Sequence, residues 1–203
     1  MIQEEKRLWK KGYKYVVGID EVGRGPLAGP VMASAVFISQ KYFKKAKKIK
    51  NVKDSKQLSK KKRKEVFDEI MKDKNIKWGT GSVSEKIIDK INILQATKLA
   101  MIKAIKDLEK RNKIKVDYLI LDGKMKLDIN IDQKSIIKGD DKIFSISMAS
   151  IIAKVTRDEL MIKYDKKYPQ YNFKKHKGYG TKEHINNIKK YGISNIHRKS
   201  FQY

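Results

Sequence analysis

The sequence predicts an α/β domain whose sheet has an antiparallel half and a parallel half. The first observation is the order of segments: three strand-like runs come early, then long helices, a further strand and a helix-rich tail. The second is size, because 203 residues with 40% hydrophobic content can bury one large core. The chain shows no internal repeat and no long linker. We therefore expect one domain over residues 1–203.

Five short runs rich in apolar residues predict the strands. The first covers residues 14–19, and the second, VMASAVFI at 31–38, follows a loop rich in glycine and proline. Residues 78–83 form the third candidate. VDYLIL at 116–121 is a compact apolar run, and residues 135–137 give a short last strand.

Helices are predicted between and after these strands. Residues 41–53 read as a Lys-dense connection, and Ser59 is placed to cap a helix over 60–74. A short helix is expected at 84–91 and a longer one at 94–110, because apolar residues recur there at helical spacing.

The last third of the chain predicts more helix. Residues 146–164 carry a face of small and apolar side chains suited to packing on a sheet, and Pro169 ends that helix. Residues 171–180 form a basic, aromatic and glycine-containing loop, and Thr181 is placed to cap a final helix reaching residue 191.

Composition limits the classes of protein. The net charge is +26, which attracts polyanions and favours nucleic acid as the partner. The alternative explanation of the charge is that Lys simply occupies every solvent-exposed face. Only six of the 49 basic residues are Arg, the side chain best suited to binding phosphate, and this bias fits the alternative. Cysteine is absent, which excludes disulfides and thiolate metal sites. No apolar run approaches a membrane span, and no export signal is evident, so we expect a cytoplasmic protein without a membrane partner.

Acidic residues follow three of the predicted strands. They are Asp20 with Glu21, then Asp122, then Asp140 with Asp141 beside it. In open α/β sheets, ligand sites gather at the carboxyl ends of strands. Carboxylates without His or Cys select Mg²⁺ or Mn²⁺, and two-metal hydrolysis of a phosphodiester would explain an acidic cluster in a basic protein. Any one Asp alone would more often be a turn or cap residue.

The loop after Glu21 has a composition suited to ligand approach. Gly23 and Gly25 leave room for a substrate beside the main chain, and Arg24 between them could face a phosphate. The alternative is a tight turn only. The three histidines, His176, His184 and His197, have no metal-ligand spacing and are expected to be structural or on the surface.

Six segments resemble, in order, the motifs of bacterial type 2 ribonuclease H (ribonuclease HII). They are GIDEVGRGPLAGPV, NVKDSKQLS, INILQAT, YLILDGK, KGDDKIFSISMASIIAKVTRD and FKKHKGYGT, and the resemblance covers roughly residues 13–201. It implies a ribonuclease H-like fold, with a five-stranded mixed sheet flanked by helices. It also implies a catalytic core at about 13–165 and a helical C-terminal segment at about 166–203 that contributes to substrate binding.

The resemblance implies a metal-dependent endonuclease. The substrates would be RNA–DNA hybrids and duplex DNA holding single ribonucleotides, nicked on the 5′ side to leave 3′-hydroxyl and 5′-phosphate ends. Ribonucleotide removal and RNA primer processing, in DNA repair and replication, would be its tasks. The enzyme would use two divalent ions, Mg²⁺ or Mn²⁺, and act as a monomer.

The resemblance also implies roles for single residues. Asp20, Glu21, Asp122 and Asp140 would be the catalytic metal ligands. The substrate-binding residues would be Gly23, Arg24 and Gly25 at the ribose 2′-hydroxyl and adjacent phosphate, Tyr179 stacking near the ribonucleotide, and Lys56, Asn92 and Gln95 contacting the strands.

Two positions depart from the family pattern. Lys124 stands where Asn is usual, and Asp141 stands where Ser is frequent, so Asp141 could compete with Asp140 as a ligand.

Two other functions stay open at this point. A type 3 ribonuclease H would cut hybrids but handle single ribonucleotides poorly. A basic nucleic-acid-binding protein without catalysis would account for the charge alone.

Overall fold

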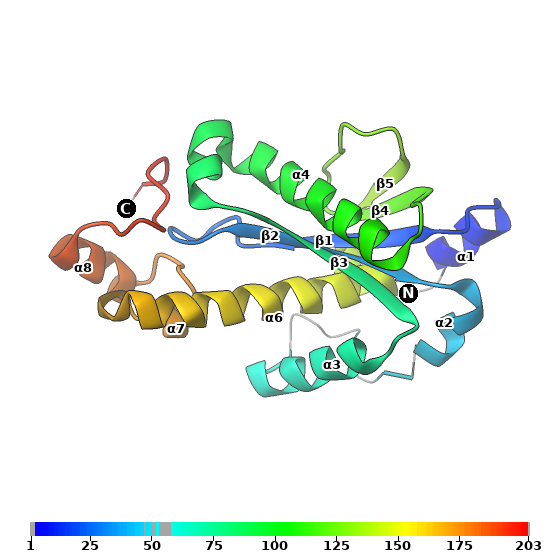
Figure 1. Ribbon diagram of the computed structural model, residues 1–203, viewed down its shortest axis with the longest axis horizontal. Helices are drawn as coiled ribbons and strands as arrows, with labels where there is room; N and C mark the ends of the chain where they lie inside the picture. Colours follow the sequence, from blue (N-terminus) through cyan, green and yellow to red (C-terminus); the bar gives the residue numbers. More distant parts are fainter. Residues whose placement is uncertain (1–2, 47, 50–51, 53–57, 203) are drawn as a thin grey trace.

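A computed structural model of the chain describes residues 3–46, 48–49, 52 and 58–202. Its centre is a five-stranded sheet in the order β3-β2-β1-β4-β5 (Figure 1). β1 pairs antiparallel with β2, and β2 with β3, whereas β1, β4 and β5 run parallel. The predicted antiparallel and parallel halves are confirmed. The strands are β1 Val16–Val22, β2 Val31–Ile38, β3 Ile76–Val83, β4 Tyr118–Asp122 and β5 Asp132–Ile136.

Helices cover both faces of the sheet (Figure 1). α4 (Glu85–Asn112) lies on one face and shares a core with Val17, Ile19 and other apolar residues of β1, β2 and β4. α6 (Phe144–Lys167) lies on the other face together with α2 (Gln40–Ala46) and α3 (Lys60–Lys72). This three-layer packing buries the sheet on both sides, which explains why all eight residues of β2 are buried.

Two glycines bring α4 onto the sheet. A Cβ on Gly79 or Gly81 of β3 would clash with the backbone of α4 at Leu108 and Ala100. The absence of side chains there allows the helix backbone to lie directly against the strand. α4 is thereby held beside the antiparallel half of the sheet.

Most predicted helices are confirmed, with shifts of a few residues at their ends. Ser59 caps α3, since its side chain accepts a hydrogen bond from the Lys62 amide. The predicted break between two helices near residue 92 is real, because Asn92 adopts φ 63° within α4. α6 ends at Lys167, before Pro169, and Thr181 caps α8 (Lys182–Tyr191) by accepting from the His184 amide.

Two helices differ from the prediction: one was predicted as a connection, and the other was not predicted. Residues 40–46 form α2, not a connection, and Phe43 and Ala46 anchor it in the core. α1 (Gln3–Lys10) buries Leu8 and Glu5, although its sequence is mostly polar. In both helices a few buried side chains carry the packing among many charged ones.

The remaining short elements lie near the chain's acidic and C-terminal motifs. They are α5 (Gly139–Lys142), the 3₁₀ turn η2 (Pro169–Tyr171) and α7 (Phe173–His176), the last within the predicted loop 171–180. The C-terminal segment has its own apolar cluster, which includes Ala28 and Met161 from outside it. α8 lies at the opposite end of the molecule from α1 (Figure 1). Among the described residues, no helix has the length and apolar character to cross a bilayer.

Candidate active site

Asp20 and Glu21 lie inside β1, not in the loop after it. They pair with Ser34 and Ala33 of β2, and the strand continues to Val22. The sequence prediction placed the strand end three residues too early, because two acids rarely lie in a buried strand unless something compensates their charge. The strand fixes the Asp20 backbone in the middle of the sheet.

Asp122 is the last residue of β4, the parallel neighbour of β1. Asp140 comes from α5, which follows β5, and not from a strand end as expected. The Gly139 amide donates to Asp122 Oδ1 at 2.6 Å, which ties the two elements together. Ser147 of α6 donates its hydroxyl proton to the Asp140 carbonyl. Asp140 is thereby fixed from both sides.

The three aspartates converge. One carboxylate oxygen each from Asp20, Asp122 and Asp140 lies within 4.8 Å of the other two. Asp140 is fully buried, whereas Asp141 is exposed and lines a separate hollow with Gln3 and Lys134. The cluster therefore includes Asp140 and leaves Asp141 out.

The electrostatics of the cluster favour a bound cation. Burial, followed by the Glu21 and Asp122 charges, raises the pKa of Asp20 well above its usual value. Burial also raises the pKa of Glu21, although the Arg24 guanidinium, 3.4 Å from Glu21 Oε1, acts in the opposite direction. Within the described residues, Glu21 Oε2 is buried without a hydrogen-bond partner. An all-oxygen donor set with an unsatisfied carboxylate fits a hard divalent ion.

A cleft of about 360 Å³ opens over the acids. Asp20, Glu21 and Asp122 line it together with Tyr179. Three further polar lining residues, Arg63, Ser150 and Lys154, were not predicted from the sequence. Arg63 and Lys154 could not be singled out among 49 basic residues. Ser150 forms a hydrogen bond with Asp20, but it lies in a helix whose side chains were predicted only to pack in the core.

The predicted glycine residues and tyrosine also meet. We call residues 23–30 the glycine loop; it begins where β1 ends and leads into β2. A Cβ on Gly25 would lie 3.9 Å from Tyr179 Cε1, and the Leu27 amide donates to the Gly178 carbonyl at 2.8 Å. Tyr179 is 41% exposed, so its ring faces the cleft edge with area left for a ligand.

Two of the predicted substrate residues do not line the cleft. Asn92 and Gln95 are exposed on α4 and do not line it. Asn92 Oδ1 accepts from the Leu94 and Gln95 amides, so this side chain caps the second half of α4. Lys56 lies outside the described residues.

The three histidines form a buried group behind Tyr179. His184 Nδ1 lies 2.9 Å from the Tyr179 carbonyl, and His184 Nε2 lies 3.1 Å from His197 Nε2. His176 stacks on His184 with ring centroids 4.4 Å apart. Burial lowers the pKa of His184 and of His197 to about 4, so both are neutral at physiological pH. Their contacts are structural, and the sequence did not indicate that the three meet.

A mixed five-stranded sheet with an aspartate cluster at its central strands, beside a cleft with basic side chains, defines a ribonuclease H-like nuclease. The family model described as Ribonuclease HII matches residues 17–203, and the chain belongs to that family.

Comparisons with individual proteins lead to the same family and fold. The chain is 54% identical over 197 residues to Ribonuclease HII of Clostridioides difficile (strain 630), covering 97% of this chain and 73% of that protein. The crystal structure of ribonuclease H2 from Pyrococcus horikoshii OT3 superposes with a TM-score of 0.75 at 26% identity, covering 93% and 94% of the two chains. The ribonuclease HII in the PCNA:RNase HII complex from Archaeoglobus fulgidus has a TM-score of 0.74 at 23% identity, covering 93% and 96%, and shares the fold.

Family membership and fold together support a ribonuclease H enzyme that acts on RNA–DNA hybrids with a divalent metal. The type 3 alternative is not favoured, since the matching family model is that of ribonuclease HII.

Proposed function

We propose that this protein nicks duplex DNA on the 5′ side of single embedded ribonucleotides, in addition to cutting the RNA strand of hybrids. The products would carry 3′-hydroxyl and 5′-phosphate ends. The observation that carries the proposal is the meeting of two features at one cleft: the aspartate cluster within 4.8 Å, and the glycine loop beside Tyr179. The first suits phosphodiester hydrolysis, and the second suits recognition of one sugar.

Asp20, Asp122 and Asp140, with Glu21 at the edge, are proposed to hold Mg²⁺ or Mn²⁺, two ions during catalysis. When bound, such ions neutralise charge on the scissile phosphate and make water a competent nucleophile at neutral pH. The protein's own part is to keep these carboxylates in place. Gly139 fixes Asp122, Ser147 fixes the Asp140 backbone, and the sheet fixes Asp20.

The glycine loop and Tyr179 are proposed to recognise the ribonucleotide. Gly25 is exposed and has no side chain, so a sugar can reach the main chain there. A 2′-hydroxyl both donates and accepts hydrogen bonds, and it distinguishes RNA from DNA. Arg24 would contact the adjacent phosphate, and the exposed face of Tyr179 would stack on the sugar or base.

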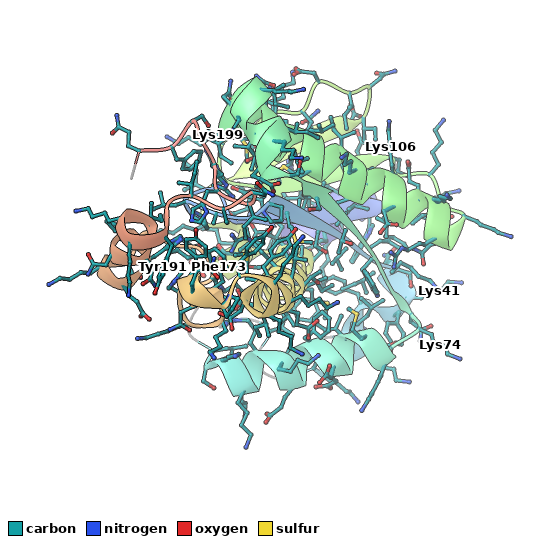
Figure 2. The ribbon with its side chains drawn as sticks, turned by 60° about the vertical axis from the view of Figure 1, so that its left-hand side comes forward. Lys41, Lys74, Lys106, Phe173, Tyr191 and Lys199 are labelled. Carbon is teal, nitrogen blue, oxygen red and sulfur yellow. The ribbon has the colours of Figure 1, made fainter. Side chains whose placement is uncertain are left out.

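The charge of the chain is proposed to bind the duplex without reading its sequence. Lys41 of α2, Lys106 of α4, and Lys74 and Lys199 of connecting segments lie around the periphery, which favours a general positive field (Figure 2). Phosphate contacts release counterions, so affinity should fall steeply as salt rises. Lys56, Asn92 and Gln95 are proposed as further strand contacts, although the Asn92 side-chain oxygen already caps α4.

We place this activity in the cytoplasm, in ribonucleotide removal and RNA primer processing during DNA repair and replication, and expect a monomer. The aspartate cluster weighs against the alternative of a basic binding protein without catalysis, since nucleic-acid binding alone has no use for buried acids.

The decisive experiment is cleavage of a labelled DNA duplex that holds one ribonucleotide, with Mg²⁺, with Mn²⁺ and with chelator. A metal-dependent nick on the 5′ side of the ribonucleotide is expected. Cutting of a longer hybrid alone would indicate type 3 behaviour, and tight binding without cutting would indicate the binding protein. Asp20→Asn should abolish cleavage and retain substrate binding, whereas Asp128→Asn, an 83% exposed acid, should cut at the parent rate.

A further inference from the structure

Arg198 is a buried cation beneath the glycine loop. It is fully buried, and its guanidinium donates to three main-chain carbonyls. Nη2 donates to Gly23 O at 2.5 Å, Nη1 to Arg24 O at 2.8 Å and Nε to Gly29 O at 2.9 Å. One side chain from the C-terminal segment thus holds both ends of a loop about 170 residues earlier in the chain.

These contacts fix the direction of two amides. In a trans peptide, the carbonyl of one residue and the N–H of the next point in opposite directions. The described residues contain no cis peptide. Because the Gly23 and Arg24 carbonyls point at the buried guanidinium, the N–H groups of Arg24 and Gly25 point away from it. Both residues are exposed, so these amides face outward.

Neither amide is used inside the protein. Across the described part of the chain, the Arg24 and Gly25 N–H groups have no acceptor, whereas the nearby Leu27 and Gly29 amides donate to Gly178 and Ile196. Two adjacent N–H groups that face outward form a small anion-binding concavity. Gly25 lies beside Tyr179, and Tyr179 lines the cleft.

We propose that Arg198 is a positioning residue that orients the Arg24 and Gly25 amides as donors to the sugar–phosphate backbone at the ribonucleotide. This inference rests on the proposed function. Arg198 acts through the loop and does not touch the substrate, because it is fully buried.

The chemistry requires arginine at this position. A planar guanidinium can donate to several carbonyls at once in a fixed arrangement, whereas a lysine ammonium is a single point with flexible donors. Burial lowers the pKa of Arg198 to about 9, so the group keeps its charge at neutral pH. Its face also lies 4.9 Å from the Phe201 ring, which restricts its rotation.

Arg157 supplies a matched control. It is equally buried and also donates to three carbonyls, but these belong to Ala28, Pro30 and Lys177. Its contacts therefore hold the base of the loop and leave the direction of the Arg24 and Gly25 amides to Arg198.

The test compares Arg198→Lys with Arg157→Lys. Both should lower Tm to a similar extent, since each loses three buried hydrogen bonds. Arg198→Lys should raise KM for a duplex with one ribonucleotide by roughly tenfold, because two oriented donors are lost. Arg157→Lys should change KM far less, and kcat at saturating substrate should fall little in either. An equal KM for the two variants at equal Tm loss would overturn the inference.

A measurement on the parent protein covers the case in which a variant fails to fold. The ¹⁵N-labelled protein is titrated with a short RNA–DNA hybrid in chelator, which prevents cleavage. The Arg24 and Gly25 amide resonances should shift, and the Leu27 amide should shift less. Unchanged Arg24 and Gly25 resonances at saturation would refute the inference. If the parent cuts no ribonucleotide substrate but these amides still shift, the proposed function fails and the orientation of the donors stands.

Discussion

Replacing Asp20 by asparagine should stabilise the protein in the absence of metal. The substitution keeps the shape of the side chain and an oxygen that can still accept from the Glu21 amide, a bond of 2.8 Å in the parent. It removes one of three negative charges from a buried cluster. The change therefore isolates charge from packing.

The magnitude follows from the distances. Two unit charges 4.8 Å apart repel by about 3.5 kcal/mol at an effective dielectric constant of about 20. Three such pairs sum to about 10 kcal/mol, comparable with the whole stability of a typical domain. The metal-free cluster must therefore take up a proton or a cation, in agreement with the raised pKa of Asp20. Because a proton already relieves part of the repulsion, we expect a net gain of about 2 kcal/mol, or about 4–8 °C in Tm.

The assay is thermal unfolding of the parent, Asp20→Asn and Asp128→Asn, in chelator and then in Mg²⁺ or Mn²⁺. Asp128 is 83% exposed, so its substitution should change the free energy of unfolding by less than about 0.5 kcal/mol. Metal at one hundred times its Kd should raise the free energy of unfolding of the parent and the control by about 2.7 kcal/mol, and that of Asp20→Asn much less. A variant that melts below the parent in chelator would show that the three carboxylates do not repel as calculated.

Three further predictions concern the scaffold. His197 has its pKa lowered from 6.5 to about 4, so the unfolded chain takes up the proton first and stability is lost as pH falls below 6.5. Urea unfolding should show a loss of about 2 kcal/mol between about pH 7 and pH 5 from this group, and His197→Gln should reduce the slope but leave the part due to His184. Gly81→Ala should cost at least about 2 kcal/mol, because its Cβ would clash with the Ala100 carbonyl; an unchanged Tm would mean that α4 can move away from the sheet. Thr181→Ala should cost about 1 kcal/mol in chemical denaturation, and Ser84→Ala, whose side chain makes no cap bond, should cost less; equal losses would contradict the capping assignment.

The strands and caps were predictable because their signals are local. Residues 31–38 form a strand with both ends as predicted, since proline precedes a run that is apolar except for Ser34. Ser59 and Thr181 both cap helices as expected, because a cap depends on a few neighbouring residues. By contrast, α1 and α2 are held by a few buried side chains among many charged ones, and the sequence did not reveal them.

The meeting of the three aspartates was predictable, but several other features of the candidate site were not. Asp20 and Asp122 meet because β1 and β4 are parallel neighbours, and Asp140 joins them from α5. The sequence placed Asp20 after its strand and left Asp140 and Asp141 in competition. Burial of one and exposure of the other resolved that competition, and burial is a property of the packed molecule.

The sequence by itself determined the α/β class, the mixed sheet, the acidic residues and the family, because these depend on periodicity, composition and motifs along the chain. Only the tertiary structure placed Arg198 beneath Gly23, brought the three histidines together behind Tyr179 and added Ser150 to the cleft. The contacts of Arg198 and Ser150 join residues far apart in sequence. No local sequence pattern reveals where a guanidinium will be buried, because its partners are main-chain carbonyls that every residue possesses.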